Sequence, residues 1–124
     1  MKILLRIFVV FLLVLVGGFI FLSLGLERGR ELIINDVNLL LLTDGTYSGK
    51  HNAGRWSNEV SVIIKDHTIT EINVVKDVTF PLADVTKELI NRVLEKQSIQ
   101  VDAISGATVT SKAYLKSIEN ALRK

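Results

Sequence analysis

A run of twenty uncharged residues near the N-terminus, residues 7–26, most constrains how this chain can fold. A helix rises about 1.5 Å per residue, so a helical run of this length matches the hydrocarbon core of a bilayer. Lys2 and Arg6 precede the run, and a cluster of mixed charges follows it. We therefore expect residues 1–27 to form one transmembrane anchor, and the rest of the 124-residue chain has room for one small domain.

The orientation and the retention of this anchor depend on less specific signals. Basic residues are equally frequent on its two sides, but the Met1 amine and the acids Glu27 and Glu31 favour a cytoplasmic N-terminus. A cleaved signal peptide is the alternative, because Ser23 and Gly25 are small residues at the positions that a signal peptidase reads. The apolar run is longer than the core of a usual signal peptide, so we expect a retained anchor. Either way, the remainder of the chain is exported.

Cysteine content and charge exclude several classes of function. The sequence has no cysteine, so disulfides and thiolate metal sites are excluded. Beyond residue 43 the acidic and basic residues nearly balance and are scattered, whereas a nucleic-acid surface needs a concentrated basic face. His51 and His67 have no metal-ligand spacing, and we expect both to be exposed.

The middle of the chain has the pattern of antiparallel strands. An Asp-Gly turn precedes a short strand over residues 46–48, which a glycine ends. Residues 59–65 are rich in β-branched residues, with Val60, Val62 and Ile64 on one face, and Asp66-His67 follows as a tight turn. Residues 68–75 then run back, which predicts a β-hairpin.

Two later segments have the spacing of amphipathic helices. Residues 84–96 form the first, with Asp84 as the expected cap, and the second begins near Thr110 or Ser111, either of which is a natural cap. Its apolar stripe consists of Tyr114, Leu115, Ile118, Ala121 and Leu122. The order predicts an α+β domain, a small antiparallel sheet with packed helices preceded by one transmembrane helix.

The boundaries of this domain follow from the same patterns. Residues 28–43 mix apolar and polar residues, and we expect a linker that is a tether or a short helix, packed on the domain or on the membrane. Residues 44–124 then form the domain.

A run of hydroxyl and small residues, from Asp102 to Ser111, stands directly before the last helix. One or two hydroxyls are enough to cap a helix, and Ser105-Gly106-Ala107-Thr108 lies upstream of the expected cap. Small residues at a helix N-terminus expose backbone N–H groups and a partial positive charge, an arrangement that suits a phosphate. From the residues alone, a capped turn without a ligand remains the alternative.

The same run resembles the signature of the FMN-binding domain family, found in the flavoprotein subunits of the sodium-pumping quinone reductase and its ferredoxin-linked relatives. The family pattern is Asp, two variable residues, Ser or Thr, and then Gly-Ala-Thr. It is matched by Asp102, Ser105, Gly106, Ala107 and Thr108. Residues 44–49 resemble the opening strand of the same domain.

The resemblance implies that FMN is attached through its phosphate to Thr108 by a separate flavin transferase that uses FAD. Trp56, Tyr47 and Phe80 are candidates to stack on the flavin ring, and a place in the core is the alternative for each. Asp102 would orient the loop or form an Asx turn. The candidate cofactor-binding residues are Thr108, Ser105, Gly106, Ala107, Asp102, Thr110 and Trp56.

These expectations combine into one function. The chain is expected to be an electron carrier on the outer side of a bacterial cytoplasmic membrane, held by a single span. Its partners would be a membrane electron donor and an external electron acceptor. The alternatives are a module, binding or sensory, that holds FMN without a covalent bond, and a tethered structural domain without a cofactor.

Overall fold

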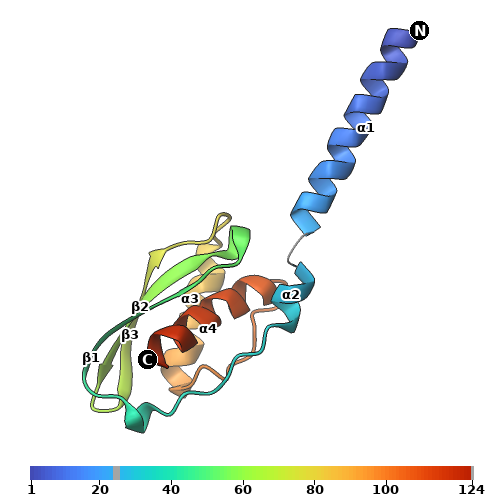
Figure 1. Cartoon of the computed structure of the whole chain (residues 1–124). Helices are drawn as coiled ribbons and strands as arrows, with labels where there is room; N and C mark the ends of the chain where they lie inside the picture. Colours follow the sequence, from blue (N-terminus) through green and yellow to red (C-terminus); the bar gives the residue numbers. More distant parts are fainter. Residues whose placement is uncertain (24–25, 124) are drawn as a thin grey trace.

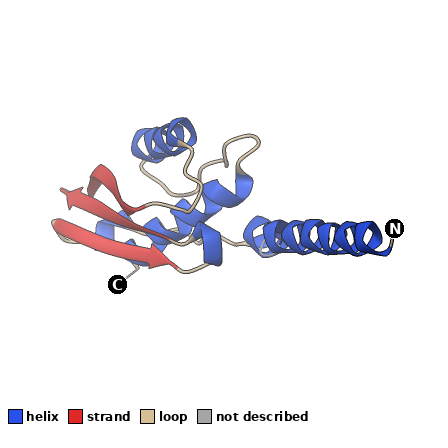
Figure 2. Ribbon diagram, turned by 90° about the horizontal axis from the view of Figure 1, so that it is seen from above, coloured by secondary structure: helices blue, strands red, loops and turns tan. Residues whose placement is uncertain are grey.

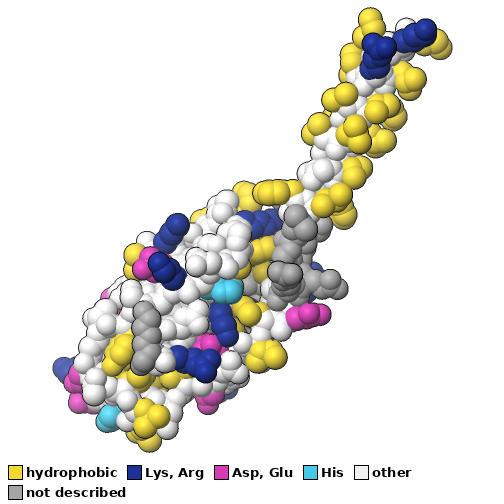
Figure 3. Space-filling model, in the orientation of Figure 1, with side chains coloured by type: hydrophobic (Ala, Val, Ile, Leu, Met, Phe, Trp, Pro, Cys, Tyr) yellow, Lys and Arg dark blue, Asp and Glu magenta, His cyan; other side chains and the backbone are white. Residues whose placement is uncertain are grey.

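The computed structural model describes residues 1–23 and 26–123. Helix α1 (Lys2–Ser23) extends away from the folded domain, as Figure 1 shows. Hydrophobic side chains cover it, and basic residues lie at its far end (Figure 3). Within the described residues it is the one helix long and apolar enough to cross a membrane, and it is not buried against the protein. The candidate signal cleavage site after Gly25 lies outside the described residues.

The sheet has three antiparallel strands in the order β1 (Gly45–His51), β2 (Asn58–Lys65) and β3 (Thr68–Lys76). The predicted hairpin is confirmed. Asp66 and His67 have φ values of 52° and 61°, and two successive left-handed residues are typical of the type I′ turn that joins twisted strands. Figure 2 shows the three strands side by side, with α1 leading away from them.

Strand β1 is longer than the sequence pattern predicts, because Gly49 lies inside the strand and does not end it. Helix α4 (Thr108–Leu122) crosses β1 at this point. A Cβ atom at Gly49 would collide with the backbone of Ser117 and Ala121, so the glycine permits close packing of helix on strand.

The core lies between the sheet and α4. Val60, Val62 and Ile64 on alternate positions of β2 are buried, as the sequence pattern predicts. Helix α4 contributes its predicted apolar stripe, and all of these residues are buried: Tyr114, Leu115, Ile118, Ala121 and Leu122. Helix α3 (Ala83–Lys96) contacts both β3 and α4 and adds Leu89 and Val93 to the core. The predicted α+β fold class is therefore confirmed.

The predicted caps are wrong for both helices. The N-cap residue of α3 is Leu82, and no side chain caps it; Asp84 lies inside the first turn. An acidic residue in the first turn still interacts favourably with the helix dipole, which explains its place in the sequence. The N-cap residue of α4 is Ala107, again without a side-chain cap.

The segment between α1 and the sheet lies on the domain. It contains the short helix α2 (Leu26–Glu31), an irregular run, and the 3₁₀ turn η1 (Leu39–Leu41). Helix α2 contacts α4, and the backbone N–H of Asn35 donates to Glu119 of α4. Residues 28–43 were expected to pack on the domain or on the membrane, and in the structure this segment contacts the domain.

Candidate functional site

The loop before α4 is held in a conformation that requires glycine. Gly106 has a φ of +79°, in the left-handed region that other residues rarely adopt, and no atom lies within 4 Å of the position a Cβ would take. The N–H of Ala107 donates to the carbonyl of Ile104, and the N–H of Ile104 donates to the buried Ser111 hydroxyl. Ser111 therefore stabilises the loop and does not cap the helix.

Because this loop turns tightly at Gly106, α4 begins at Thr108, earlier than the sequence pattern predicts. The first N–H groups of any α-helix have no partner within the helix, and Ala107 offers no side-chain acceptor for them. The N–H of Ser111 donates to the carbonyl of Ala107 and is the first to be bonded within the helix. The backbone N–H groups without a partner in the helix are therefore those of residues 108–110. Thr108 is exposed, and its hydroxyl is at the end of the helix where an anion is favoured.

A cavity of about 390 Å³ lies at this helix end. Its walls come from four separate segments: α2, the 3₁₀ turn η2 (Gly54–Trp56), the connection between β3 and α3, and the start of α4. It is lined by Arg30, Arg55, Trp56, Val78, Phe80, Leu82, Gly106, Ala107, Thr108, Val109 and Thr110. Among the lining residues that the structure describes, Arg30 and Arg55 are cationic and none is acidic. The cavity therefore favours an anionic ligand.

Backbone contacts bring the aromatic residues of the cavity together. The N–H of Thr79 donates to the carbonyl of Arg55 at 2.9 Å, which joins η2 to the connection after β3. This bond places Trp56, which is half-buried, and Phe80, which is 62% exposed, in the same cavity wall. The guanidinium of Arg55 lies over the Trp56 ring.

A second, larger cavity of about 820 Å³ adjoins the first. The two share Arg55, Trp56, Phe80 and Val109 in their linings. His51 lines the second cavity and is half-buried, so the expectation that it is exposed is wrong. Burial, and secondarily the charge of Lys116, lowers the pKa of His51. His67 is exposed, as expected.

The structure brings five of the seven candidate residues together in the smaller cavity: Trp56, Gly106, Ala107, Thr108 and Thr110. Asp102 and Ser105 are exposed and lie outside its lining. The backbone carbonyl of Asp102 accepts a hydrogen bond from Arg92 of α3 at 3.1 Å. Tyr47 lines neither cavity, and its hydroxyl donates to the carbonyl of Thr43 at 2.7 Å.

Sequence reasoning missed two charged residues of the cavity. Arg55 had a usable signal, because it precedes Trp56 in a polar loop. No feature of the sequence indicated Arg30, because it is distant in sequence from every motif. It reaches the cavity through the contact of α2 with α4. Both supply the positive charge that a phosphate group requires.

Comparison with known proteins agrees with this geometry. The family model described as FMN-binding domain matches residues 54–123, which is more than half of the chain. The match begins at η2 and includes Trp56, the Gly106 loop and the whole of α4. A comparison with curated proteins gave no match. The resemblance in the sequence is thus confirmed at the level of the family: the chain belongs to the FMN-binding domain family, and its cofactor is FMN.

Proposed function

We propose that this protein is a membrane-anchored electron carrier that holds FMN at the start of α4, attached through the phosphate to Thr108. The observation that carries the proposal is the position of Thr108. Its side chain is exposed, it is the first residue of α4, and it lines a cavity that also contains Arg30 and Arg55. A phosphate attached there is next to unpaired backbone N–H groups and two cations.

The lining of the cavity supports a flavin more than a small anion. Trp56 and Phe80 provide flat apolar surfaces for a ring system, and Val78 and Leu82 line the same space. When bound, FMN supplies one- and two-electron redox chemistry, while the protein sets its orientation and environment. In this proposal the residues at the α4 end bind the phosphate and the aromatic wall orients the ring.

A separate enzyme is needed for covalent attachment. A threonine hydroxyl is a weak nucleophile unless a base lies beside it, and His51 lines the second cavity and not the one that contains Thr108. Gly106 has no side chain and Ala107 is buried, so neither blocks access to the exposed Thr108. A flavin transferase that uses FAD therefore completes the proposed maturation.

Helix α1 supports the proposed location. Its length and composition suit a single span. The proposed place of the domain is the outer side of a bacterial cytoplasmic membrane, because the Met1 amine and the acids Glu27 and Glu31 favour a cytoplasmic N-terminus. The proposed partners are an electron donor in the membrane and an electron acceptor beyond it.

The same cavity supports a second candidate function. Two arginines and a helix N-terminus can hold a phosphate without a covalent bond, so the protein can be a binding or sensory module for free FMN. Under this alternative the Thr108 hydroxyl only donates to the phosphate.

Intact mass spectrometry of the full chain distinguishes the two functions. The protein is produced with and without a co-expressed flavin transferase. The carrier proposal expects a flavin adduct only with the transferase, and the adduct survives denaturation. Yellow protein that loses its colour on denaturation in both preparations would instead support the binding module.

A further inference from the structure

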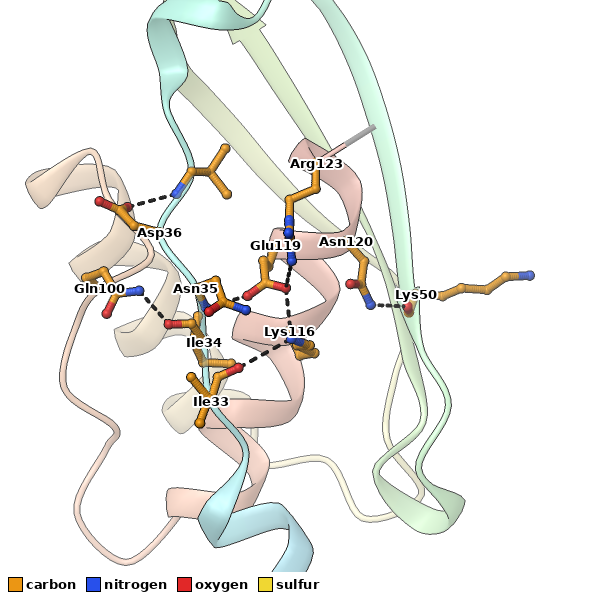
Figure 4. A network of polar contacts seen from close by, with 11 residues as sticks. Ile33, Ile34, Asn35, Asp36, Lys50, Gln100, Lys116, Glu119, Asn120 and Arg123 are labelled. Carbon is orange, nitrogen blue, oxygen red and sulfur yellow. Dashed lines mark hydrogen bonds and ion pairs between the residues drawn. The ribbon is translucent and has the colours of Figure 1, made fainter.

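The chain that follows α1 is fastened along α4 in a regular order. We call residues 30–35 the strap. Lys112 of α4 donates to the carbonyl of Arg30, and Lys116, one turn later, donates to the carbonyl of Ile33 at 3.3 Å. One turn further, Glu119 accepts from the N–H of Asn35 at 2.5 Å, 84 positions away in sequence. Figure 4 shows the contacts of Lys116 with Ile33 and of Glu119 with Asn35, with this segment lying beside α4.

This order sets the direction of the strap. Its first residue lies near the start of α4 and its last lies near the end, so the two run in the same direction. At Gly29, directly before the strap, the backbone lies so close to Val109 that a Cβ atom would collide with it. Val109 follows Thr108 in the first turn of α4. The end of the strap that leads to α1 therefore lies at the cavity end of α4.

The contact at Glu119 comes from a buried carboxylate. The side chain is fully buried, and a buried carboxylate is costly unless it is paired. Besides Asn35, it bonds Lys116 at 2.8 Å and Arg123 at 3.4 Å. Burial alone raises the pKa of Glu119, but these hydrogen bonds and charges outweigh burial and leave the pKa below its ordinary value. Release of the strap would remove one of its bonds and expose the carboxylate to solvent.

A further contact comes from outside α4. The side-chain amide of Gln100, in the loop before the helix, donates to the carbonyl of Ile34 at 2.6 Å. Every one of these bonds uses the backbone of the strap. These hydrogen bonds therefore hold the strap in a fixed register along α4 and its preceding loop, and the side chain of Ile34 also packs against the core.

We propose that the strap is a positioning device that holds the cavity end of α4 at the bilayer surface, with lipid head groups as the neighbours of the cavity mouth. The inference rests on the membrane anchoring and FMN binding of the proposed function. Three residues that line the flavin site also have exposed sides at its mouth, and these fit such a surface. Arg30 is a cation suited to anionic head groups, and Phe80 and Leu82 are apolar residues suited to the interface. Phe21 of α1 lines the adjoining cavity.

Depth-dependent fluorescence quenching tests this position. The chain contains one tryptophan, Trp56, and it lies in the cavity wall. Full-length protein is placed in vesicles of phosphatidylcholine and phosphatidylglycerol that carry a nitroxide either on the head group or deep in the acyl chain. We expect the head-group label to quench the flavin of the loaded protein and Trp56 of the unloaded protein, and the deep label to quench both less.

Variants then test whether the strap sets this position. Glu119→Ala should release the strap and reduce the head-group quenching, and exchange of the Asn35 amide should become about tenfold faster or more. Asn120→Ala is the matched control, because Asn120 is on the same helix and donates to Lys50 of β1, not to the strap. Gln100→Ala is the second variant; it changes an exposed residue, so the core stays intact, and should reduce the quenching partly.

The outcomes separate this inference from the proposed function. Wild-type protein that binds flavin and stays with the vesicles but shows no head-group quenching overturns the inference alone. Unchanged quenching in variants with a fast-exchanging Asn35 amide also overturns it. Quenching of Trp56 in protein that takes up no flavin would support the strap and count against the proposed function. Protein that does not stay with the vesicles contradicts both.

Discussion

The guanidinium carbon of Arg55 lies 4.2 Å from the centroid of the Trp56 ring. A cation over an indole face at this distance contributes about 0.5–1 kcal/mol at a partly exposed position. The contact fixes the orientation of the ring, and the Arg55 carbonyl is itself held by the N–H of Thr79. Trp56 therefore lines the cavity in a fixed orientation, and it also packs partly against the core.

The first prediction concerns Trp56→Ala. If the flavin stacks on this ring, the variant should raise flavin fluorescence, because the quenching contact is lost. It should also destabilise the unloaded domain by about 2 kcal/mol, since the side chain is only half-buried. Phe80→Ala is the control: Phe80 is 62% exposed, so its loss should alter the flavin signal with little change in the melting temperature. Flavin fluorescence that stays the same in Trp56→Ala would show that the ring lies elsewhere.

Gly106→Ala tests the loop that leads into α4. The substitution adds no clash but forces an L-residue into a φ of +79°, which costs about 1–2 kcal/mol. Melting of the unloaded protein should show this loss, whereas Ser105→Ala, an exposed neighbour outside the left-handed region, should have little effect. An equal melting temperature in the two variants would contradict the requirement for glycine.

The sequence was sufficient to predict the elements whose residues interact locally. Alternation at Val60, Val62 and Ile64 gave the buried face of β2, and Asp66-His67 gave the turn. The start of α4 was misplaced because hydroxyls usually cap helices, while here Ser111 bonds the preceding loop instead. The hydrogen bond between Ser111 and Ile104 therefore outweighs the preference of serine for a helix cap.

The rest of the site could not be read from the sequence because it depends on contacts between distant backbone groups. Thr79 and Arg55 are joined through their main chains, and the strap is bound to α4 through its own backbone. Backbone groups are the same in every residue, so no pattern of side chains indicates such contacts. Arg30 reaches the cavity because α2 contacts α4.

The third prediction concerns alkaline pH. Burial, and then the hydrogen bond to Asp77, raises the pKa of Tyr114 from 10.0 to about 12. The neutral phenol is favoured in the folded state, so its contribution to stability is complete below pH 10 and is lost as the pH rises toward 12. Absorbance of the phenolate should show ionisation of Tyr114 near pH 12, and this step should be absent in Tyr114→Phe. Ionisation of Tyr114 near pH 10 would contradict the burial of its phenol and its hydrogen bond to Asp77.

Glu119 gives the opposite dependence at acid pH. Its pKa lies below the ordinary value of 4.5, so its contribution to stability is complete above that value and is lost as the pH falls through the lowered pKa. Denaturant unfolding measured between pH 7 and pH 3 should lose more free energy in the wild type than in Glu119→Gln, which cannot titrate. Identical pH profiles would contradict the paired state of this carboxylate.

Attachment of FMN at Thr108 is the central proposal, and a denaturing gel tests it most directly. Full-length wild type, Thr108→Ala and Thr110→Ala are each produced with a flavin transferase, and flavin fluorescence is recorded in the gel. Thr110 is the matched control because it has the same hydroxyl and lines the same cavity two residues later. We predict fluorescent bands for the wild type and Thr110→Ala and none for Thr108→Ala; a fluorescent Thr108→Ala band would contradict the account.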